Sequence, residues 1–319
     1  MDELAHRFVE ANGIRLHIAE QGSGPLVILC HGFPEAWYSW RHQLPALAAA
    51  GFHAVAPDMR GYGRTDRPEA IEQYTILHLV GDVIGLMDAL GAETAVIAGH
   101  DWGAPVAWSA ALMRPDRVHG VIGLSVPYLP RGPLSPLAGL RAAHGEDFYM
   151  VYFQRPGAAE AELERDPRDT LRRLLYSASG DAPPGEGQFV GNAAGGLLPH
   201  TLDPETLPAW LDEADVDFYA AEFARSGFRG GLNWYRNLDR NWELTGPWQG
   251  ARVTLPALFV AGDRDLVLAF PGFGHLVAGL EAFVPNLRRS LVLPGCGHWT
   301  QQERPSEVTD AMLEFLRGL

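Results

Sequence analysis

The 319-residue chain contains no lysine, so all 25 of its basic residues are arginine, against 39 acidic residues. The formal net charge is −14 and the sequence pI is about 5.2. This charge argues against a nucleic-acid partner and against binding to an anionic membrane surface, because both require clustered positive charge.

Cysteine is scarce and long apolar runs are missing. Cys30 and Cys296 are too few for a disulfide framework, and they lack the spacing of metal ligands. We expect both thiols to be reduced and mostly buried, in a reducing, cytoplasmic compartment. No apolar run approaches the roughly 18 residues of a membrane span, and the first residues carry no secretory signal pattern. We therefore expect no membrane span.

What the sequence does contain is an alternation of short apolar runs with helical patterns. The predicted strands cover residues 14–19, 25–30, 53–57, 94–98, 119–124, 257–260 and 290–293. The predicted helices of the same region cover residues 38–50, 77–90, about 103–113, 272–283 and 305–317. Strands alternating with helices indicate an α/β fold, with a mostly parallel sheet covered on both faces.

The alternation is interrupted after Pro127. Residues 127–139 are rich in Pro, Gly and Leu and are typical of a linker, and residues from about 140 to 243 have helical periodicity. The sequence thus predicts a discontinuous core with a helical insertion between strands 119–124 and 257–260. We assign residues 1–130 to the first part of the core, 131–245 to a helical cap and 246–319 to the second part of the core.

A candidate nucleophile stands where an apolar strand leads into Gly99-His100-Asp101-Trp102-Gly103 and a helix follows. This is the strand–turn–helix context of a nucleophile elbow, with Asp101 at the position that more commonly holds serine. The glycines let the strand and the helix approach closely. A carboxylate is already ionised at neutral pH and attacks carbon to form an ester, which suits displacement at sp³ carbon. The competing interpretation is an aspartate that caps a helix.

An oxyanion hole is predicted next to this turn. Strand 25–30 ends in His31-Gly32-Phe33-Pro34, and in the α/β-hydrolase fold this loop supplies one backbone N–H while the residue after the nucleophile supplies another. We assign the two N–H groups to Phe33 and Trp102, and we expect His31 to hold the loop by side-chain hydrogen bonds. The side chains expected in the substrate pocket are Phe33, Pro34, Trp102, Tyr152 and Trp299.

A general base and its orienting acid are predicted at the ends of the last two strands. Strand 290–293 runs into a glycine-rich loop that contains His298, where this fold places its base. Strand 257–260 is followed by Asp263 and Asp265, one of which should orient the imidazole. We choose Asp265 and expect Asp263 to shape the turn. The order Asp101, Asp265, His298 is the nucleophile–acid–base order of the fold.

These motifs make the chain resemble the soluble epoxide hydrolases over nearly its whole length, particularly the hydrolase portion of the vertebrate enzyme. The core segments that carry the resemblance are HGFPE (31–35), RGYG (60–63), GHDWG (99–103) and CGHWTQ (296–301). Narrower segments lie in the predicted cap, namely YFQRPG (152–157), SGFRG (226–230) and NWYRN (233–237).

The resemblance implies an α/β-hydrolase fold with an eight-stranded sheet and an inserted helical cap. It also implies a monomer or homodimer that converts a small apolar epoxide and water to a diol, without metal or organic cofactor. The vertebrate enzyme carries an added phosphatase domain, and we expect no such activity in this chain.

The resemblance further implies two cap tyrosines that donate hydrogen bonds to the epoxide oxygen. Tyr235 matches the second by its flanking residues, and Tyr149 matches the first by its distance from Phe153, with Tyr152 as the competitor. A phenol with a pKa near 10 assists departure of a basic alkoxide.

Two other functions are weighed against epoxide hydrolysis. A haloalkane dehalogenase would use the same aspartate, but those enzymes often carry Asn where Phe33 stands, and they lack the cap tyrosines. A catalytically silent, ligand-binding α/β-hydrolase would usually lose a member of the nucleophile–acid–base set, and all three are present here.

Overall fold

The computed structural model of the chain describes residues 4–187, 190–191 and 193–319. Within them, one eight-stranded sheet has the order β1-β2-β4-β3-β5-β6-β7-β8. The strands are β1 (Ala5–Ala11), β2 (Ile14–Gln21), β3 (Leu26–Cys30), β4 (His53–Pro57), β5 (Ala95–His100), β6 (Val118–Leu124), β7 (Ala257–Gly262) and β8 (Leu287–Leu293). The pairs β1–β2 and β2–β4 are antiparallel, and the other pairs are parallel. The predicted mostly parallel, eight-stranded sheet is confirmed.

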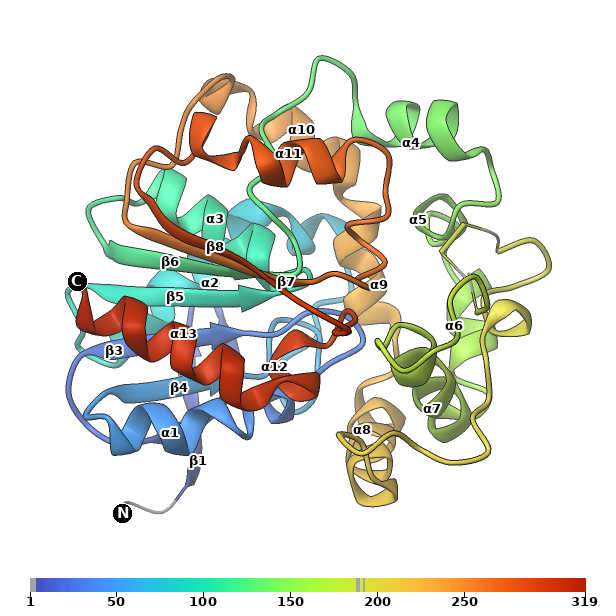
Figure 1. Cartoon of the computed structure of the whole chain (residues 1–319), viewed down its shortest axis with the longest axis horizontal. Coiled ribbons are helices and arrows are strands. Elements are labelled where there is room, and N and C mark those ends of the chain that lie inside the picture. Colours follow the sequence, from blue (N-terminus) through green and yellow to red (C-terminus); the bar gives the residue numbers. More distant parts are fainter. Residues whose placement is uncertain (1–3, 188–189, 192) are drawn as a thin grey trace.

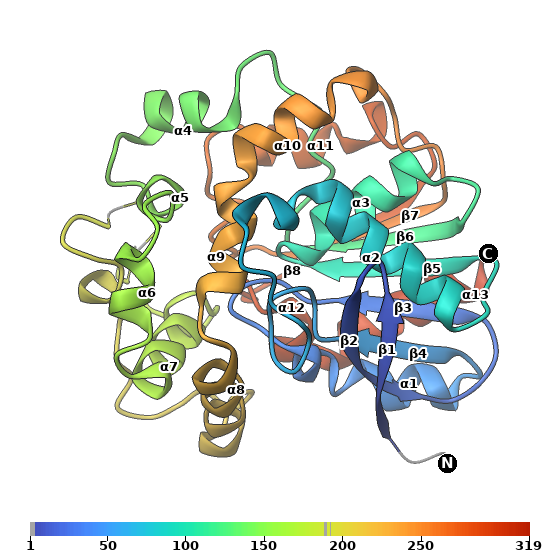
Figure 2. The ribbon, with the colours of Figure 1, turned by 180° about the vertical axis from the view of Figure 1, so that it is seen from behind.

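Helices cover both faces of the sheet because its central strands are apolar on both sides. In β3, Ile28 and Cys30 pack into one hydrophobic cluster, while Val27 and Leu29 pack into the other. Helices α2 and α3 belong to the first cluster, and α1 and α13 to the second, so they lie on opposite faces (Figures 1 and 2). The core helices are α1 (Gln43–Ala49), α2 (Ile76–Ala89), α3 (Gly103–Met113), α11 (Phe273–Ala278), α12 (Thr300–Glu303) and α13 (Pro305–Arg317), with 3-10 turns η1 (Trp37–Trp40), η2 (Ile71–Tyr74) and η5 (Leu280–Ala282).

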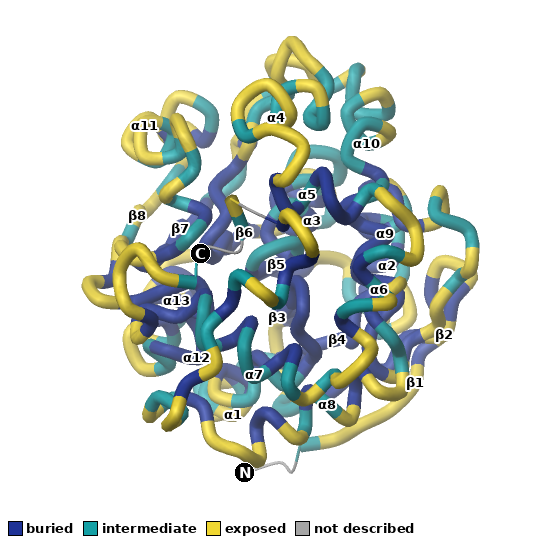
Figure 3. Tube along the Cα trace, turned by 90° about the vertical axis from the view of Figure 1, so that its right-hand side faces the viewer, coloured by how far each residue is buried: buried dark blue, intermediate teal, exposed yellow. Residues whose placement is uncertain are grey.

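A helical insertion follows β6 and ends before β7, as the sequence predicts. Its helices are α4 (Pro136–His144), α5 (Tyr149–Tyr152), α6 (Ala158–Leu163), α7 (Pro167–Ser177), α8 (Glu213–Ser226), α9 (Arg229–Arg236) and α10 (Leu238–Leu244), with 3-10 turns η3 (Leu198–His200) and η4 (Gly246–Trp248). Helices α5 to α9 lie across the ends toward which the parallel strands point (Figure 1). Seen from that side, the insertion has both exposed and buried segments (Figure 3). The loops that leave the parallel strands therefore end beneath the insertion.

The structure corrects the expected elements at the N-terminus. Strand β1 was not predicted, because at this sheet edge only Val9 and Ala11 are buried and the other side chains give no apolar run. A local signal was nevertheless present: Asn12-Gly13, both with positive φ, forms the turn between β1 and β2. Asn-Gly is the strongest short signal for a two-residue hairpin.

The largest further differences from the predicted elements concern three of them, and other boundaries differ by one or two residues. The expected helix 38–50 is divided into η1 and α1, and the expected helix 272–283 into α11 and η5. Strand β8 starts at Leu287, three residues before the expected 290. The prediction missed this start because Arg288, Arg289 and Ser290 are exposed and give no apolar pattern.

No helix among the described residues is long and apolar enough to cross a membrane.

Candidate active site

The turn between β5 and α3 presents Asp101 in a strained backbone conformation. Its φ is +48°, in the left-handed region that a residue with a Cβ rarely adopts. The flanking residues must be glycine: a Cβ at Gly99 would lie 2.0 Å from the carbonyl oxygen of Gly103, and a Cβ at Gly103 would lie 2.1 Å from that of Cys30. The strand and the helix therefore meet so closely that the side chain of Asp101 is held at the end of the sheet.

The loop after β3 binds the carboxylate of Asp101. The backbone N–H of Phe33 donates to Asp101 Oδ1 at 2.8 Å. The N–H of Trp102, the other predicted oxyanion donor, makes no hydrogen bond within the described part of the chain. His31 holds the loop, as expected: its Nδ1 bonds to the carbonyl oxygen of Gly32 at 2.9 Å, and its Nε2 accepts from the N–H of Met59 at 3.0 Å.

His298 lies between two carboxylates. Its Nε2 is 3.4 Å from Asp101 Oδ2, and its Nδ1 is 2.9 Å from Asp265 Oδ1. Asp265 Oδ1 also accepts from the N–H of Val267 at 2.9 Å, which fixes the carboxylate. Asp263 is exposed and accepts instead from the N–H of Gly295 at 2.7 Å. The structure therefore brings Asp265 to the imidazole and leaves Asp263 in the turn.

The protonation of His298 follows from these neighbours. Burial by itself lowers the pKa of the imidazole, because the charged form loses its hydration. The charge of Asp265 and the hydrogen bonds to Asp101 and Asp265 outweigh burial and hold the pKa of His298 well above its usual value. The neighbours of His298 therefore favour its protonated form.

Two tyrosines from the insertion face the same cavity as Asp101 and His298. Tyr149 begins α5 and Tyr235 lies near the end of α9, with their ring centroids 5.9 Å apart. Both line a cavity of about 40 Å³ with Asp101 and His298. Burial and, next, the charge of Asp101 raise the pKa of both hydroxyls well above the usual range. Both are therefore neutral O–H donors at physiological pH.

Tyr152 does not occupy its expected place in the pocket wall. Its hydroxyl donates to Glu162 Oε2 at 2.9 Å, and it is not among the described residues that line the cavities at Asp101. Positions three apart on a helix lie close together, so the helix alone does not separate Tyr149 from Tyr152. Their hydrogen bonds do: Tyr152 also donates to the carbonyl oxygen of Ala158 at 3.2 Å, outside the cavity that Tyr149 lines. The other expected pocket residues do line a cavity: Phe33, Pro34 and Trp299 the smaller one, and Trp102 a larger one.

The larger cavity has a volume of about 570 Å³ and meets the smaller one at Asp101 and Tyr149, which line both. Its wall is mostly apolar and comes from α3, the segment between β6 and α5, α10 and the loop after β7. An apolar molecule could therefore reach the nucleophile from this side.

Sequence reasoning assigned no role to a buried pair behind His298. His100 Nδ1 bonds to Glu35 Oε2 at 2.7 Å, and His100 Nε2 bonds to the carbonyl oxygen of His298 at 2.7 Å. Burial raises the pKa of Glu35, but the charge of His100 and its hydrogen bond outweigh burial and lower this pKa to about 2. Glu35 Oε2 also accepts from the N–H of Gly32 at 2.8 Å. The pair thus links the oxyanion loop to the loop that carries His298. Both residues belong to conspicuous motifs, but nothing in the sequence shows that they meet.

Comparison with known proteins places this geometry in a family. A family profile described as "alpha/beta hydrolase fold" matches residues 25–305. Epoxide hydrolase A of Mycobacterium tuberculosis is 49% identical, over 100% of this chain and 99% of that protein. The chain belongs to the epoxide hydrolase family of α/β-hydrolases.

Solved structures and a vertebrate relative agree with this membership. The crystal structure of epoxide hydrolase A from Mycobacterium thermoresistibile has a TM-score of 0.94 and 50% identity, covering 99% of both chains. The bifunctional epoxide hydrolase 2 of Sus scrofa is 41% identical over 98% of this chain and 55% of that protein. The expected resemblance to the epoxide hydrolase family, including a vertebrate member, is therefore confirmed.

Proposed function

We propose that the chain hydrolyses epoxides to vicinal diols through a covalent ester on Asp101. One observation carries the proposal: a single cavity is lined by the Asp101 carboxylate, by His298 and by two neutral tyrosine hydroxyls. A carboxylate suits attack on carbon, and a pair of O–H donors suits a departing alkoxide.

The first step forms the ester. Asp101 Oδ2 attacks an epoxide carbon while the N–H of Phe33 holds Oδ1. The epoxide C–O bond breaks, and its electron pair goes to the oxygen. This oxygen accepts hydrogen bonds from Tyr149 and Tyr235 and takes the proton of one of them, which leaves that residue as a tyrosinate. Because burial keeps both phenols neutral, each can donate a proton at the moment the alkoxide forms.

The second step hydrolyses the ester and restores Asp101. Esterification removes the negative charge of Asp101, and with it one of the interactions that raise the pKa of His298. The imidazolium then gives up its proton more readily. This proton goes to the tyrosinate and restores the phenol, and the neutral imidazole accepts a proton from water. Hydroxide adds to the ester carbonyl, the oxyanion is held by the N–H groups of Phe33 and Trp102, and the diol leaves with a proton from His298. Asp101, released as the carboxylic acid, returns its proton to His298. Asp265 orients the imidazole throughout.

Isotope labelling tests the covalent route. Repeated turnover in ¹⁸O-water should place ¹⁸O in Asp101, because water attacks the ester carbonyl. In a His298→Gln variant, the second step should stall and an ester should accumulate, detectable as a mass increase equal to that of the epoxide. An unlabelled Asp101 after many turnovers would exclude the covalent route.

Haloalkane dehalogenation remains the alternative on the same nucleophile. Membership of the epoxide hydrolase family and the two tyrosine hydroxyls favour a departing alkoxide over a departing halide. Comparing turnover of styrene oxide with that of 1-bromobutane separates the two reactions.

We also propose that residues 131–245 act as a cap that selects the substrate. Their helices supply Tyr149, Tyr235 and much of the apolar wall of the 570 Å³ cavity, which supports a small apolar epoxide as substrate. Screening fatty-acid, terpenoid and aryl epoxides would define the class.

A cytoplasmic location and a monomeric or homodimeric state complete the proposal. The free thiols of Cys30 and Cys296 are buried, and burial raises the pKa of Cys30 to about 12, which suits a reducing compartment. Cell fractionation would test the location, and sedimentation analysis the oligomeric state.

A further inference from the structure

A cavity of about 500 Å³ lies apart from the two at Asp101 and shares no described wall residue with them. Three segments that are distant in sequence form it: the β1–β2 hairpin, the loop after β4 and the end of α8. The wall residues that matter here are Phe8, Arg15, Arg64, Asp66, Arg67 and Arg225.

Positive charge gathers in this cavity although the whole chain carries −14. Four arginines line it, and Asp66 is the carboxylate among its described wall residues. Beside it lie Glu222, Asp58, which accepts from the N–H of Arg64 at 3.1 Å, and Glu10, which is opposite Arg15 in the β1–β2 register. Glu222 is buried. Its Oε2 forms an ion pair with Arg225 Nη1 at 2.6 Å, and its Oε1 lies 3.8 Å from Arg64 Nε. The described wall of the cavity therefore presents four guanidinium groups and one carboxylate, although the whole molecule is acidic.

Many guanidinium N–H groups remain available. Arg15 stacks over the ring of Phe8 at 3.8 Å, and its guanidinium makes no hydrogen bond to any residue that the structure describes. The guanidinium of Arg64 likewise has no described hydrogen-bond acceptor, since its ion pair with Glu222 is too long for one. Arg67 uses Nη1 for the carbonyl oxygen of Arg225. Each guanidinium carries five N–H donors. Most of the guanidinium N–H groups that line the cavity therefore make no hydrogen bond to a described residue.

We propose that this cavity binds a small phosphorylated polyanion. The planar guanidinium group of arginine donates paired hydrogen bonds to the oxygens of a phosphate. Guanidinium groups approaching from three segments suit tetrahedral phosphates, which accept hydrogen bonds in every direction, better than a planar carboxylate. The volume accommodates two linked phosphates, so inorganic pyrophosphate is the appropriate probe.

A bound anion would connect the core to the insertion near the active site. Arg64 and Arg67 belong to the core loop after β4, and Arg225 lies in the last turn of α8. Helix α9, which carries Tyr235, begins four residues later at Arg229. A ligand held from both sides would therefore stabilise the position of α9 against the core.

Calorimetric titration with pyrophosphate at low ionic strength tests the site without any epoxide. We expect one site per chain, with inorganic phosphate binding more weakly because it engages fewer arginines. Arg15→Gln and Arg64→Gln should each weaken binding by about tenfold or more, equivalent to ~1.4 kcal/mol. Neither change removes a described side-chain hydrogen bond, so both variants should fold. Binding should weaken steeply with added salt.

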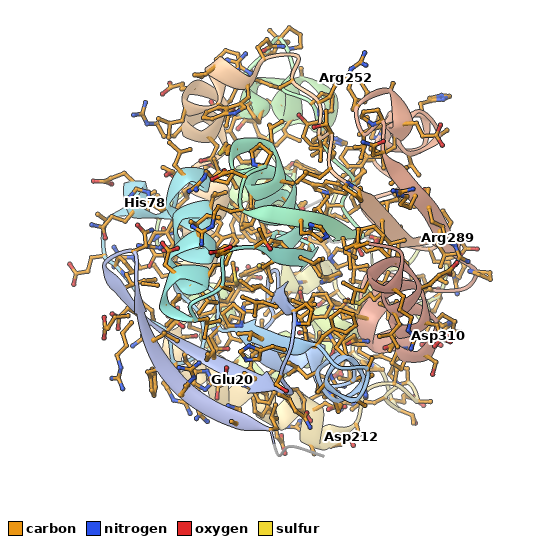
Figure 4. The ribbon with its side chains drawn as sticks, turned by 90° about the vertical axis from the view of Figure 1, so that its left-hand side faces the viewer. Glu20, His78, Asp212, Arg252, Arg289 and Asp310 are labelled. Carbon is orange, nitrogen blue, oxygen red and sulfur yellow. The ribbon has the colours of Figure 1, made fainter. Side chains whose placement is uncertain are left out.

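Arg289→Gln is the matched control. Arg289 lies on β8, at the other edge of the sheet from β1, and Figure 4 shows it across the molecule from Glu20 of β2. This variant loses the same charge and should bind pyrophosphate like the wild type. The absence of binding at millimolar pyrophosphate would overturn the proposal. So would unchanged affinity in the Arg15→Gln, Arg64→Gln double variant, or an equal loss in Arg289→Gln.

A thermal shift gives a second readout. Because a ligand that binds only the folded chain stabilises it in proportion to RT ln(1 + [L]/Kd), saturating pyrophosphate should raise the Tm of the wild type. The same concentration should leave the Tm of the double variant unchanged. A rise of equal size in both proteins would mean that pyrophosphate binds elsewhere.

Discussion

Asp101 Oδ2 lies 3.4 Å from His298 Nε2, across the gap between the turn after β5 and the loop after β8. Asp101, the proposed nucleophile, thus raises the pKa of His298, the proposed base, until the proposed ester forms. The same imidazole is anchored on its other nitrogen by Asp265. This relationship orders the two proposed steps, because the base becomes available only after the carboxylate has reacted.

Replacing Asp101 by alanine should remove the reaction while sparing the fold. We expect epoxide turnover to fall by roughly 10⁴-fold or more, because no other carboxylate lines the described wall of the smaller cavity. Alanine tolerates the left-handed φ of +48° less well than aspartate, so a small loss of stability should accompany the change. Product formation and circular dichroism measure the two effects. Turnover near the wild-type rate would rule out Asp101 as the nucleophile.

Removing the tyrosine hydroxyls should slow ester formation rather than ester hydrolysis. Tyr149→Phe and Tyr235→Phe should each reduce the single-turnover alkylation rate by about 10- to 100-fold, and the double variant by roughly 10²- to 10⁴-fold. Tyr152→Phe is the control: its hydroxyl bonds to Glu162, so it should cost ~1 kcal/mol of stability and leave alkylation unchanged. A larger kinetic effect at Tyr152 than at Tyr149 would reverse the assignment.

The pKa of His298 predicts a pH-dependent stability. This pKa is raised on folding, so the imidazolium stabilises the folded state fully below about pH 6.5, the unfolded value. The stabilisation is lost as pH rises through the folded pKa. We therefore expect the difference in unfolding free energy between wild type and His298→Gln to shrink as pH increases above 6.5. Urea unfolding at several pH values measures it, and a difference that grows with pH would contradict the protonated resting state.

The Glu35–His100 pair predicts the opposite pH behaviour at low pH. The pKa of Glu35 falls from 4.5 to about 2 on folding, so its stabilisation is present above about pH 4.5 and is lost as pH falls toward 2. At neutral pH it amounts to roughly 3–4 kcal/mol, since the pKa falls by about 2.5 and a difference of one in pKa is ~1.4 kcal/mol. Glu35→Gln should destabilise the protein at pH 7 and much less at pH 2.5, as measured by urea unfolding.

Glu314→Gln supplies the control for that experiment. Glu314 pairs with Arg289 on the surface, with 71% of its side chain exposed. An exposed pair contributes little, so this variant should differ from wild type by less than about 1 kcal/mol at either pH. If Glu35→Gln behaved like Glu314→Gln, the buried pair would not stabilise the fold.

Two glycine-to-alanine changes should have opposite effects. At Gly99 a Cβ would lie 2.0 Å from backbone, so Gly99→Ala should prevent correct folding or destabilise the protein by several kcal/mol. At Gly139, inside α4, a Cβ meets nothing within 4 Å, so Gly139→Ala should stabilise by about 0.5–1 kcal/mol. Tm measurements on both variants decide this, and tolerance of Gly99→Ala would disprove the close approach of β5 and α3.

Predictions from the sequence were most accurate where a short stretch of residues is enough to identify an element or a motif. The strand–glycine–aspartate–glycine–helix pattern at Asp101 needs no distant contact to be recognised, and the apolar strands of a sheet buried on both faces stand out in the same way. The predictions were poor at the edges of the sheet. Strand β1 and the start of β8 expose most of their side chains, so an apolar pattern could not reveal them.

By itself, the sequence determined the fold class, the insertion of helices between β6 and β7, and the residue types of the site. Tertiary structure decided which of those residues meet. It placed Asp265 rather than Asp263 beside His298, turned Tyr149 toward Asp101 and Tyr152 toward Glu162, and joined Glu35 to His100. The physical reason is that periodicity and turn chemistry act over a few residues, whereas hydrogen bonding and pKa depend on burial and on partners from distant segments.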